Sequence, residues 1–380
     1  MIIQQKFTDL EKLINMAVLE REDVIHHIIL SCLAKQHIFL LGKPGVGKSY
    51  LAKKFAEAFG YIGSDGSKPY FQMQMSGGTE KSEIFGQVSL TKLKQDVLWY
   101  ESDSYLPNAR IFLLDEITRA NKLALDAVLE PINERTYKNG GKVLKTPIEF
   151  GFATSNFKFN SEHFTALADR FVSWFEIDSL STEGRSLLRR KKLNKMAITI
   201  KFTEAELKQA RLEAMSVTLS DKADALVGEI RDTLAAKHSI EISDRKEEAL
   251  CDLVRAEAWF NGRTEAIEED VLASIPCFWI DPEHKPIVTK LIRSMCNPQL
   301  EVIEQIKLDA NTLMVNKNDQ PTAYPLQDVS DQLKVLMEKL VKIEPTEKNK
   351  TAYTKTVMTV EKHQASVAEL LTVKNKKNAF

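Results

Sequence analysis

A glycine-rich loop between a short apolar run and an amphipathic segment constrains this chain more than any other feature. Residues 42–49 read Gly-Lys-Pro-Gly-Val-Gly-Lys-Ser and match the pattern G-x-x-x-x-G-K-[ST]. The run before it, residues 37–41, is mainly apolar and predicts a buried strand. Leu51, Phe55 and Phe59 follow at intervals of four, which is helical spacing. Strand, glycine loop and helix in this order predict a phosphate-binding loop.

The residue types of this loop suit a nucleotide phosphate. Glycines let the backbone curl so that its N–H groups face a phosphate, and the start of the following helix adds positive potential. We expect Lys48 to reach the β- and γ-phosphates and Ser49 to bind Mg²⁺. A chance match is the alternative, and the flanking strand and helix make it rarer. The residues expected to contact the nucleotide from this loop are Gly42, Pro44, Gly45, Val46, Gly47, Lys48, Ser49 and Tyr50.

Size and composition predict a globular protein of about two or three domains. The chain has 380 residues, of which 43% are hydrophobic and 28% charged, which allows a sizeable core. Its net charge of -1 gives no overall electrostatic attraction to nucleic acid or to a membrane. No apolar run approaches the ~18 residues of a membrane helix, and the first residues lack the apolar region of a signal peptide.

Cysteine usage indicates a reducing compartment. The cysteines are scattered, lie mostly in apolar helical contexts and form no C-x-x-C pair, so we expect buried free thiols and no metal site among them. With no signal peptide predicted, this favours a cytoplasmic protein. The cysteines are Cys32, Cys251, Cys277 and Cys296.

Strands alternate with helices as far as residue 180. This alternation predicts an α/β fold with a parallel five-stranded sheet and right-handed crossovers, and we place this core at residues 1–180. The expected strands are residues 37–41, 70–75, 110–114, 147–153 and 171–177.

Strand signals stop after Asp178, and the rest of the chain is expected to be helical. A basic helical stretch opens an all-helical domain at residues 181–295, in which Thr203 and Ser220 are expected helix caps. Residues 296–380 contain three helical stretches and end in a basic tail that we expect to be frayed. The apolar residues of the second stretch are spaced 4, 3, 4, 3, which predicts a seam packed within a small bundle. They are Val329, Leu333, Leu336, Leu340 and Ile343.

Two carboxylates follow another buried strand. Residues 110–114 end in Asp115 and Glu116, so both side chains should reach the carboxyl edge of the sheet, where α/β proteins bind ligands. Asp115 would contact the nucleotide's Mg²⁺, and Glu116 would orient and deprotonate the attacking water. The alternative is a strand that ends in acidic surface residues, and the upstream glycine loop disfavours it.

Three further polar residues are candidates for the same chemistry. Asn156 ends a strand and could hydrogen-bond the γ-phosphate and the water, although a turn residue is the alternative. Arg170 follows Asp169 and could project into a neighbouring subunit's nucleotide, which is worth ~10³–10⁵ in rate in NTPases. Arg245 opens a helix. A surface salt bridge is the alternative for each arginine.

Together these motifs resemble the AAA+ ATPases, and specifically the MoxR group. The order of glycine loop, Asp-Glu pair, asparagine, Asp-Arg-Phe and Ser-x-Arg matches that group, and the similarity covers about residues 10–290. More narrowly, the chain resembles the RavA-like branch. The segments that carry this narrower resemblance are residues 19–21, 39–42, 83–86, 105–107, 132–135, 139–140, 242–245 and 277–279.

The resemblance implies a ring-forming ATPase, usually a hexamer, that binds ATP and Mg²⁺ between subunits. Lys48 and Ser49 would be the Walker A contacts, and Asp115 and Glu116 the Walker B pair, with Ser49 and Asp115 at the metal. The other roles that it implies are sensor 1 for Asn156, a finger into the neighbouring subunit for Arg170, a sensor 2 contact from a helical lid for Arg245, and an adenine contact near Arg21.

The resemblance also implies a biological role. MoxR-group proteins typically act as chaperone-like remodellers of proteins and often work with a partner that carries a von Willebrand factor A domain. Residues 75–86 correspond to a segment that family members direct toward the axial side of the ring, where a substrate could be engaged. The β-rich module that docks a lysine decarboxylase in the RavA-like branch is replaced here by residues 344–350. We therefore do not carry that partner over.

Two other functions remain open. The chain could be an AAA+ NTPase that acts on nucleic acid, although its near-neutral charge and lack of basic-aromatic stripes disfavour this. It could also be a nucleotide-gated scaffold in which hydrolysis matters little. The complete set of Lys48, Asp115, Glu116 and Arg170 disfavours the scaffold.

Overall fold

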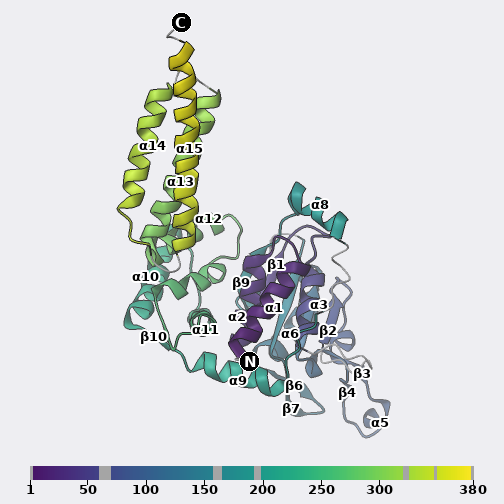
Figure 1. Cartoon of the computed structure of the whole chain (residues 1–380). Helices are drawn as coiled ribbons and strands as arrows, with labels where there is room; N and C mark the ends of the chain where they lie inside the picture. Colours follow the sequence, from purple (N-terminus) through teal and green to yellow (C-terminus); the bar gives the residue numbers. More distant parts are fainter. Residues whose placement is uncertain are drawn as a thin grey trace. The chain divides into compact units, whose positions relative to one another are not determined.

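The computed structural model describes residues 3–59, 70–156, 165–191, 198–319, 325–345 and 349–377 (Figure 1). The chain forms two compact units, Met1–Val288 and Thr289–Phe380. The domain boundaries expected at residues 180 and 295 stay predictions. The end of the basic helical stretch, from residue 192 onward, lies outside the described residues.

A five-stranded parallel sheet forms the centre of the first unit. Its order is β2-β5-β8-β1-β9, and every neighbouring pair is parallel, which confirms the predicted α/β class. The fourth predicted strand begins at Phe150 rather than at residue 147, because Pro147 has no N–H to donate to a ladder. The strands are β1 (His37–Leu41), β2 (Tyr70–Gln74), β5 (Ile111–Asp115), β8 (Phe150–Ser155) and β9 (Phe171–Glu176).

Large aromatic side chains fill the core around these strands. The ring of Phe39 stacks on that of Trp174, with 4.0 Å between their centroids. A side chain at Gly151 would collide with the ring of Phe112, so the close contact of β8 with β5 requires glycine there. The helices of this part are α1 (Ile3–Ala17), α2 (Glu22–Ala34), α3 (Lys48–Ala58), α6 (Lys122–Asn133) and α7 (Thr165–Ala168).

Two small antiparallel ladders leave the sheet, and the sequence analysis predicted neither. The side-chain amide of Asn139 joins them through two hydrogen bonds, accepting from the backbone N of Tyr100 at 2.7 Å and donating to its O at 2.9 Å. In Figure 1 they lie together in the lower part of the drawing. The elements of this region are α4 (Lys81–Phe85), β3 (Gln87–Val88), α5 (Leu90–Leu93), β4 (Tyr100–Glu101), η1 (Leu106–Asn108), η2 (Ile117–Arg119), β6 (Thr136–Asn139) and β7 (Lys142–Lys145).

The rest of the first unit is mainly helical. Thr203 and Ser220 cap their helices through their hydroxyls, as predicted, and Ser243 does the same. A short parallel ladder of β10 and β11 was not predicted. The elements are α8 (Thr182–Lys191), α9 (Glu204–Met215), β10 (Thr218–Leu219), α10 (Asp221–His238), α11 (Asp244–Phe260), β11 (Glu265–Ala266), η5 (Glu268–Cys277) and α12 (Lys285–Cys296), whose last turns belong to the second unit.

Three long helices make up most of the second unit, as the sequence predicted. They are α13 (Pro298–Asp319), α14 (Leu326–Val341) and α15 (Lys350–Lys377). The predicted seam of α14 packs inside this bundle, against residues such as Ile303, Ile306 and Val360. The frayed tail is wrong for residues 374–377, because α15 continues to Lys377. No helix in the described part of the chain is long and apolar enough to cross a membrane.

An ionic triad ties the first two helices to α11. His26 on α2 lies 2.9 Å from a carboxylate oxygen of Glu11 on α1 and 2.6 Å from one of Glu257 on α11. Burial alone would lower the pKa of His26, but its hydrogen bonds to the two carboxylates outweigh burial and raise the pKa from 6.5 to about 10. The imidazolium is therefore the form that holds the three helices together.

We expect His26→Gln to destabilise the protein in a pH-dependent way. Because the pKa is raised on folding, the stabilisation is complete below about pH 6.5 and is lost as the pH rises toward 10. The wild type should melt several degrees above the variant at pH 6.5, for a contribution of ~2–4 kcal/mol. The gap should shrink by pH 9.5. Melting curves at several pH values check this, and a gap independent of pH would remove the ionic explanation.

Candidate nucleotide site

The glycine loop follows β1 directly and opens α3. Gly45 and Gly47 have φ values of +80° and +93°, a conformation that side chains other than glycine's disfavour. A β-carbon at either position would meet nothing within 4 Å, so the left-handed backbone and not crowding favours glycine there. At Gly42 a β-carbon would collide with the carbonyl of Ile177. The loop therefore has the curled backbone that a phosphate needs.

Lys48 lies at the centre of this cradle. Its ammonium donates to the backbone O of Gly42 at 2.6 Å and of Lys43 at 3.1 Å, and to Oδ1 of Asn156 at 2.8 Å. Burial lowers the pKa of Lys48, and the carboxylates of Glu116 and Asp115 oppose that shift. Asn156, which directly follows β8, is thus in contact with the lysine of the glycine loop, and its predicted contacts with the γ-phosphate and the water stay predictions.

Ser49 and Asp115 form the candidate metal site. The hydroxyl of Ser49 donates to Oδ2 of Asp115 at 3.0 Å, and the hydroxyl of Thr154 donates to Oδ1. Mg²⁺ prefers oxygen ligands and is often held by one or two protein groups together with phosphates and water, so this pair fits the ion. Across the described residues, no group of three or more His, Cys, Asp or Glu could hold a metal. Phosphate oxygens would have to complete the shell.

Glu116 follows Asp115 in an unusual backbone conformation. Its φ is +54°, in the left-handed region, and its backbone N donates to the hydroxyl of Thr154 at 3.2 Å. The side chain is buried, with 6% of its surface exposed, and Oε2 has no hydrogen-bond partner. An ion pair of 3.5 Å joins Oε2 to Nε of Arg119. A buried carboxylate at a strand end, with one oxygen that makes no hydrogen bond, suits a general base.

Arg21 lies at the start of α2, beside the strand end that carries the glycine loop. Its guanidinium donates to the backbone O of Glu20 at 2.6 Å and to that of Asp178. Burial lowers the pKa of Arg21, and the nearby Glu20 and Asp178 oppose the shift. Asp178 is next to Ile177, whose N donates to the O of Leu41 just before the loop. An adenine contact by Arg21 stays a prediction, as does the contact by Tyr50.

Arg170 and Arg245 lie at the opposite edge of the sheet from the loop of their own chain. Arg170 precedes β9, whose first residue is in register with His37 at the start of parallel β1. The loop begins at the other end of β1, about 3.3 Å per residue away. Arg170 pairs with Asp169 at 3.0 Å, and Arg245 donates to Oδ1 of Asn133 at 3.2 Å. The structure therefore does not bring either arginine to Lys48.

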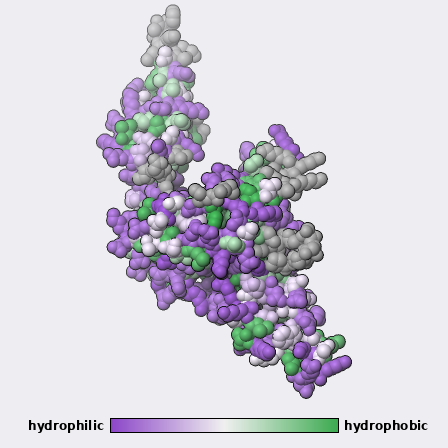
Figure 2. All heavy atoms as spheres, turned by 60° about the horizontal axis from the view of Figure 1, so that its bottom comes forward, coloured by the Kyte–Doolittle hydropathy of each residue, from purple (hydrophilic) through white to green (hydrophobic). Residues whose placement is uncertain are grey.

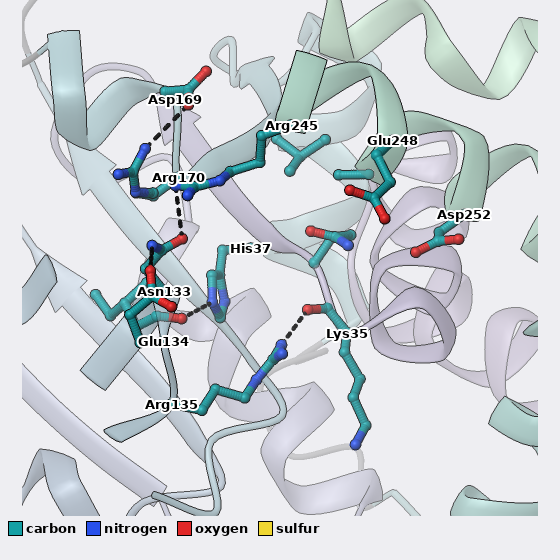
Figure 3. Close-up of a pocket in the computed structure, with 14 residues that line it drawn as sticks. Lys35, His37, Asn133, Glu134, Arg135, Asp169, Arg170, Arg245, Glu248 and Asp252 are labelled. Carbon is teal, nitrogen blue, oxygen red and sulfur yellow. Dashed lines mark hydrogen bonds and ion pairs between the residues drawn. The ribbon is translucent and has the colours of Figure 1, made fainter. Parts of the chain in front are cut away.

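The two arginines line one cavity of about 290 Å³ (Figure 3). Lys35 and Arg135 add positive charge to its wall, and Nε of Arg170 is buried without a hydrogen-bond partner. This wall mixes cations with the carboxylates of Asp169, Glu134, Glu248 and Asp252. Sequence reasoning found the arginines but not the cavity, because it forms from segments far apart in the chain.

Sequence reasoning also missed Thr154, which organises both carboxylate residues. Its hydroxyl accepts from the N of Glu116 and donates to Asp115. The signal was available, because Thr154 and Ser155 are polar residues at the end of a buried strand beside Asn156. Arg119 was missed as well, although it lies only three residues after Glu116.

A family model described as "MoxR domain in the MoxR-vWA-beta-propeller ternary systems" matches residues 5–216. The chain belongs to the MoxR family of AAA ATPase domains. A second model, described as an AAA lid domain, matches residues 223–292 of this MoxR chain. The narrower RavA-like branch stays a prediction.

Relatives of this MoxR chain include two uncharacterized proteins of Methanocaldococcus jannaschii. MJ0079 is 31% identical over 328 residues, 83% of each chain, and MJ0812 is 33% identical over 272 residues, 71% of this chain and 70% of that protein. Chaperone MoxR1 of Mycobacterium tuberculosis is 23% identical over 133 residues, 35% of this chain and 33% of its own. A solved candidate ATPase from Cytophaga hutchinsonii shares the fold, with a TM-score of 0.61, 17% identity, and coverage of 77% of this chain and 94% of that one.

Proposed function

We propose that this MoxR chain is a ring-forming ATPase that uses Mg²⁺ and ATP to remodel a protein partner. The observation that carries the proposal is that positively and negatively charged side chains meet at one edge of the sheet. Lys48 of the glycine loop lies there near the carboxylates of Asp115 and Glu116. Lys48 donates to Asn156, and Ser49 donates to Asp115. Charge neutralisation and positioning are what phosphoryl transfer requires.

Each residue has a distinct task in this proposal. The backbone N–H groups of the loop and Lys48 bind the phosphates. Ser49 and Asp115 hold Mg²⁺, which when bound neutralises charge on the phosphate oxygens. Glu116 accepts the proton of the attacking water at Oε2, the oxygen without a hydrogen bond. Asn156 orients that water and the γ-phosphate.

The positions of the two arginines support the proposed ring. They are at the edge of the sheet away from the loop of their own chain, so any nucleotide that they contact belongs to a neighbour. Contact between unlike faces of identical chains is head-to-tail and closes into a ring when the rotation fits. We propose that Arg170 and Arg245 both serve the neighbour's site. The sixfold number rests on the family resemblance.

A von Willebrand factor A domain protein is the proposed partner. The matching family model describes MoxR domains of systems that contain such a domain and a β-propeller. Co-elution of a purified von Willebrand factor A domain protein with this chain and ATP tests the partner.

The proposed contact for a client protein lies on the two small ladders that Asn139 joins. Four apolar side chains are exposed in this region, Leu90 to 73%. They are Leu90, Leu93, Leu98 and Val143. Figure 2 shows such hydrophobic residues set in a mainly hydrophilic face.

We expect ATP turnover per chain to rise with protein concentration and to stop when EDTA removes Mg²⁺. The reason is that a dilute chain offers a cradle without the neighbour's arginine, and that the phosphate charge is unneutralised without the metal. A steady-state assay of phosphate release over a hundredfold range of protein concentration measures both effects. Lys48→Ala should be inactive throughout and serves as the background. Full turnover by a monomer would overturn the ring.

A further inference from the structure

We infer that Arg119 is a positioning residue for hydrolysis, holding the orientation of Glu116 without a hydrogen bond to its reactive oxygen. The inference rests on the proposed ATPase function. Nε of Arg119 lies 3.5 Å from Oε2 of Glu116, close enough for an ion pair. The same Oε2 makes no hydrogen bond. The guanidinium therefore attracts the carboxylate, while no hydrogen bond engages Oε2, the oxygen proposed to take the proton of the attacking water.

Arg119 forms an ion pair with Glu116 but no hydrogen bond to Oε2, and this distinguishes it from an ordinary hydrogen-bond partner. A direct hydrogen bond would engage the oxygen that must accept a proton in the reaction. The carboxylate of Glu116 is buried, whereas the side chain of Arg119 is half exposed, at 51%. A half-exposed cation keeps its own hydration and stabilises a buried anion at little desolvation cost. A charge held in place before the reaction needs no rearrangement during it.

The local backbone fixes the relative position of the two side chains. Glu116 caps the short 3₁₀ turn η2, and the N of Arg119 donates to the O of Glu116 at 2.9 Å. Ile117, inside the turn, is fully buried and anchors it to the core. The left-handed φ of Glu116 lets the chain turn at the strand end, so that the two side chains meet across three residues.

The far end of this turn is anchored too. Asn121 caps α6 with its Oδ1, which accepts from the N of Ala124 at 2.9 Å. Its amide nitrogen donates to the O of Gly77 at 3.1 Å and to that of Thr79 at 2.9 Å. The loop after β2 is thereby fastened to the residues that follow Arg119. The turn is held from the core and from this loop, and the position of Arg119 is preorganised.

The test compares three single variants with the wild type. Arg119→Ala is expected to lower kcat about tenfold to a hundredfold, with KM for ATP within about twofold of the wild type. Arg119→Lys keeps the charge and should recover most of that loss. Lys122→Ala, which removes an exposed cation three residues away, should behave as the wild type. A fluorescent ATP analogue and melting curves should show unchanged affinity and stability in all three.

A double variant separates positioning of Glu116 from other effects. In a Glu116→Gln background, Arg119→Ala should cause no further loss, because the carboxylate on which it acts is gone. Wild-type kcat in Arg119→Ala, or an equal loss in both backgrounds, overturns the inference. A fall in melting temperature or ATP affinity that accounts for the loss overturns it too. If Glu116→Gln and Lys48→Ala hydrolyse ATP normally, the proposed function itself fails instead.

Discussion

Replacing Glu116 with glutamine should reduce ATP turnover by about a hundredfold to ten-thousandfold and leave ATP binding nearly unchanged. The substitution preserves the size of the side chain but removes the group that accepts the proton of the attacking water, and general-base catalysis contributes about that factor. Binding should survive because Lys48 and the glycine loop, which contact the phosphates in this scheme, are untouched. Single-turnover hydrolysis and titration with a fluorescent ATP analogue measure the two quantities separately.

Glu229→Gln is the matched control, since it makes the same change on the exposed surface of α10. It should hydrolyse ATP as the wild type does. A Glu116→Gln variant with more than about a tenth of wild-type turnover would mean that another group activates the water. Loss of binding together with turnover would instead mean that Glu116 supports the shape of the site.

The sequence was sufficient for those parts of the fold and site that depend on local pattern. The glycine loop was predictable because its residue types reflect its backbone conformation. Gly45 and Gly47 take left-handed φ values, which favour glycine. The strands at residues 37–41 and 110–114 were predicted from apolar runs, because strands buried on both faces carry no polar alternation, and those at residues 70–75 and 147–153 were predicted from alternation. Parallel strands then bring Asp115 and Asn156 to one edge whatever the details of packing.

Features that depend on the meeting of distant segments could not be read in the same way. The two small ladders are held by Asn139 and Tyr100, which are 39 residues apart, and their strands are only two to four residues long. Short polar strands of this kind give no periodic signal. The position of Arg245 beside Asn133 likewise depends on how α11 packs against the core. No signal in the sequence indicated the sheet edge on which that arginine lies, and its role stays a prediction.

Arg170→Ala should lower turnover about a thousandfold, and mixing this variant with Glu116→Gln should restore part of the activity. The loss follows from removing a cation that offsets charge in the transition state. Because the side chains of Arg170 and Asp169 are only 22% and 27% exposed, melting curves of the variant are needed to separate this loss from a loss of stability. Restoration is the sharper test, because each parent is nearly inactive alone. In a mixed ring, an Arg170→Ala chain keeps its own Glu116 and receives the intact Arg170 of a Glu116→Gln neighbour.

Random assembly at equal amounts makes about a quarter of the sites complete, so activity should rise far above that of either parent. If the arginine instead served its own chain, no mixture could assemble a complete site and the activity would stay at the parental level. Arg189→Ala, which removes an exposed arginine on α8, controls for loss of charge and should be fully active. The two variants must be mixed before the rings assemble, because rings that do not exchange chains would also stay at the parental activity. Subunit exchange measured with labelled chains shows whether mixed rings form. Restored activity in mixed rings would then mean that Arg170 contacts the nucleotide of the neighbouring chain.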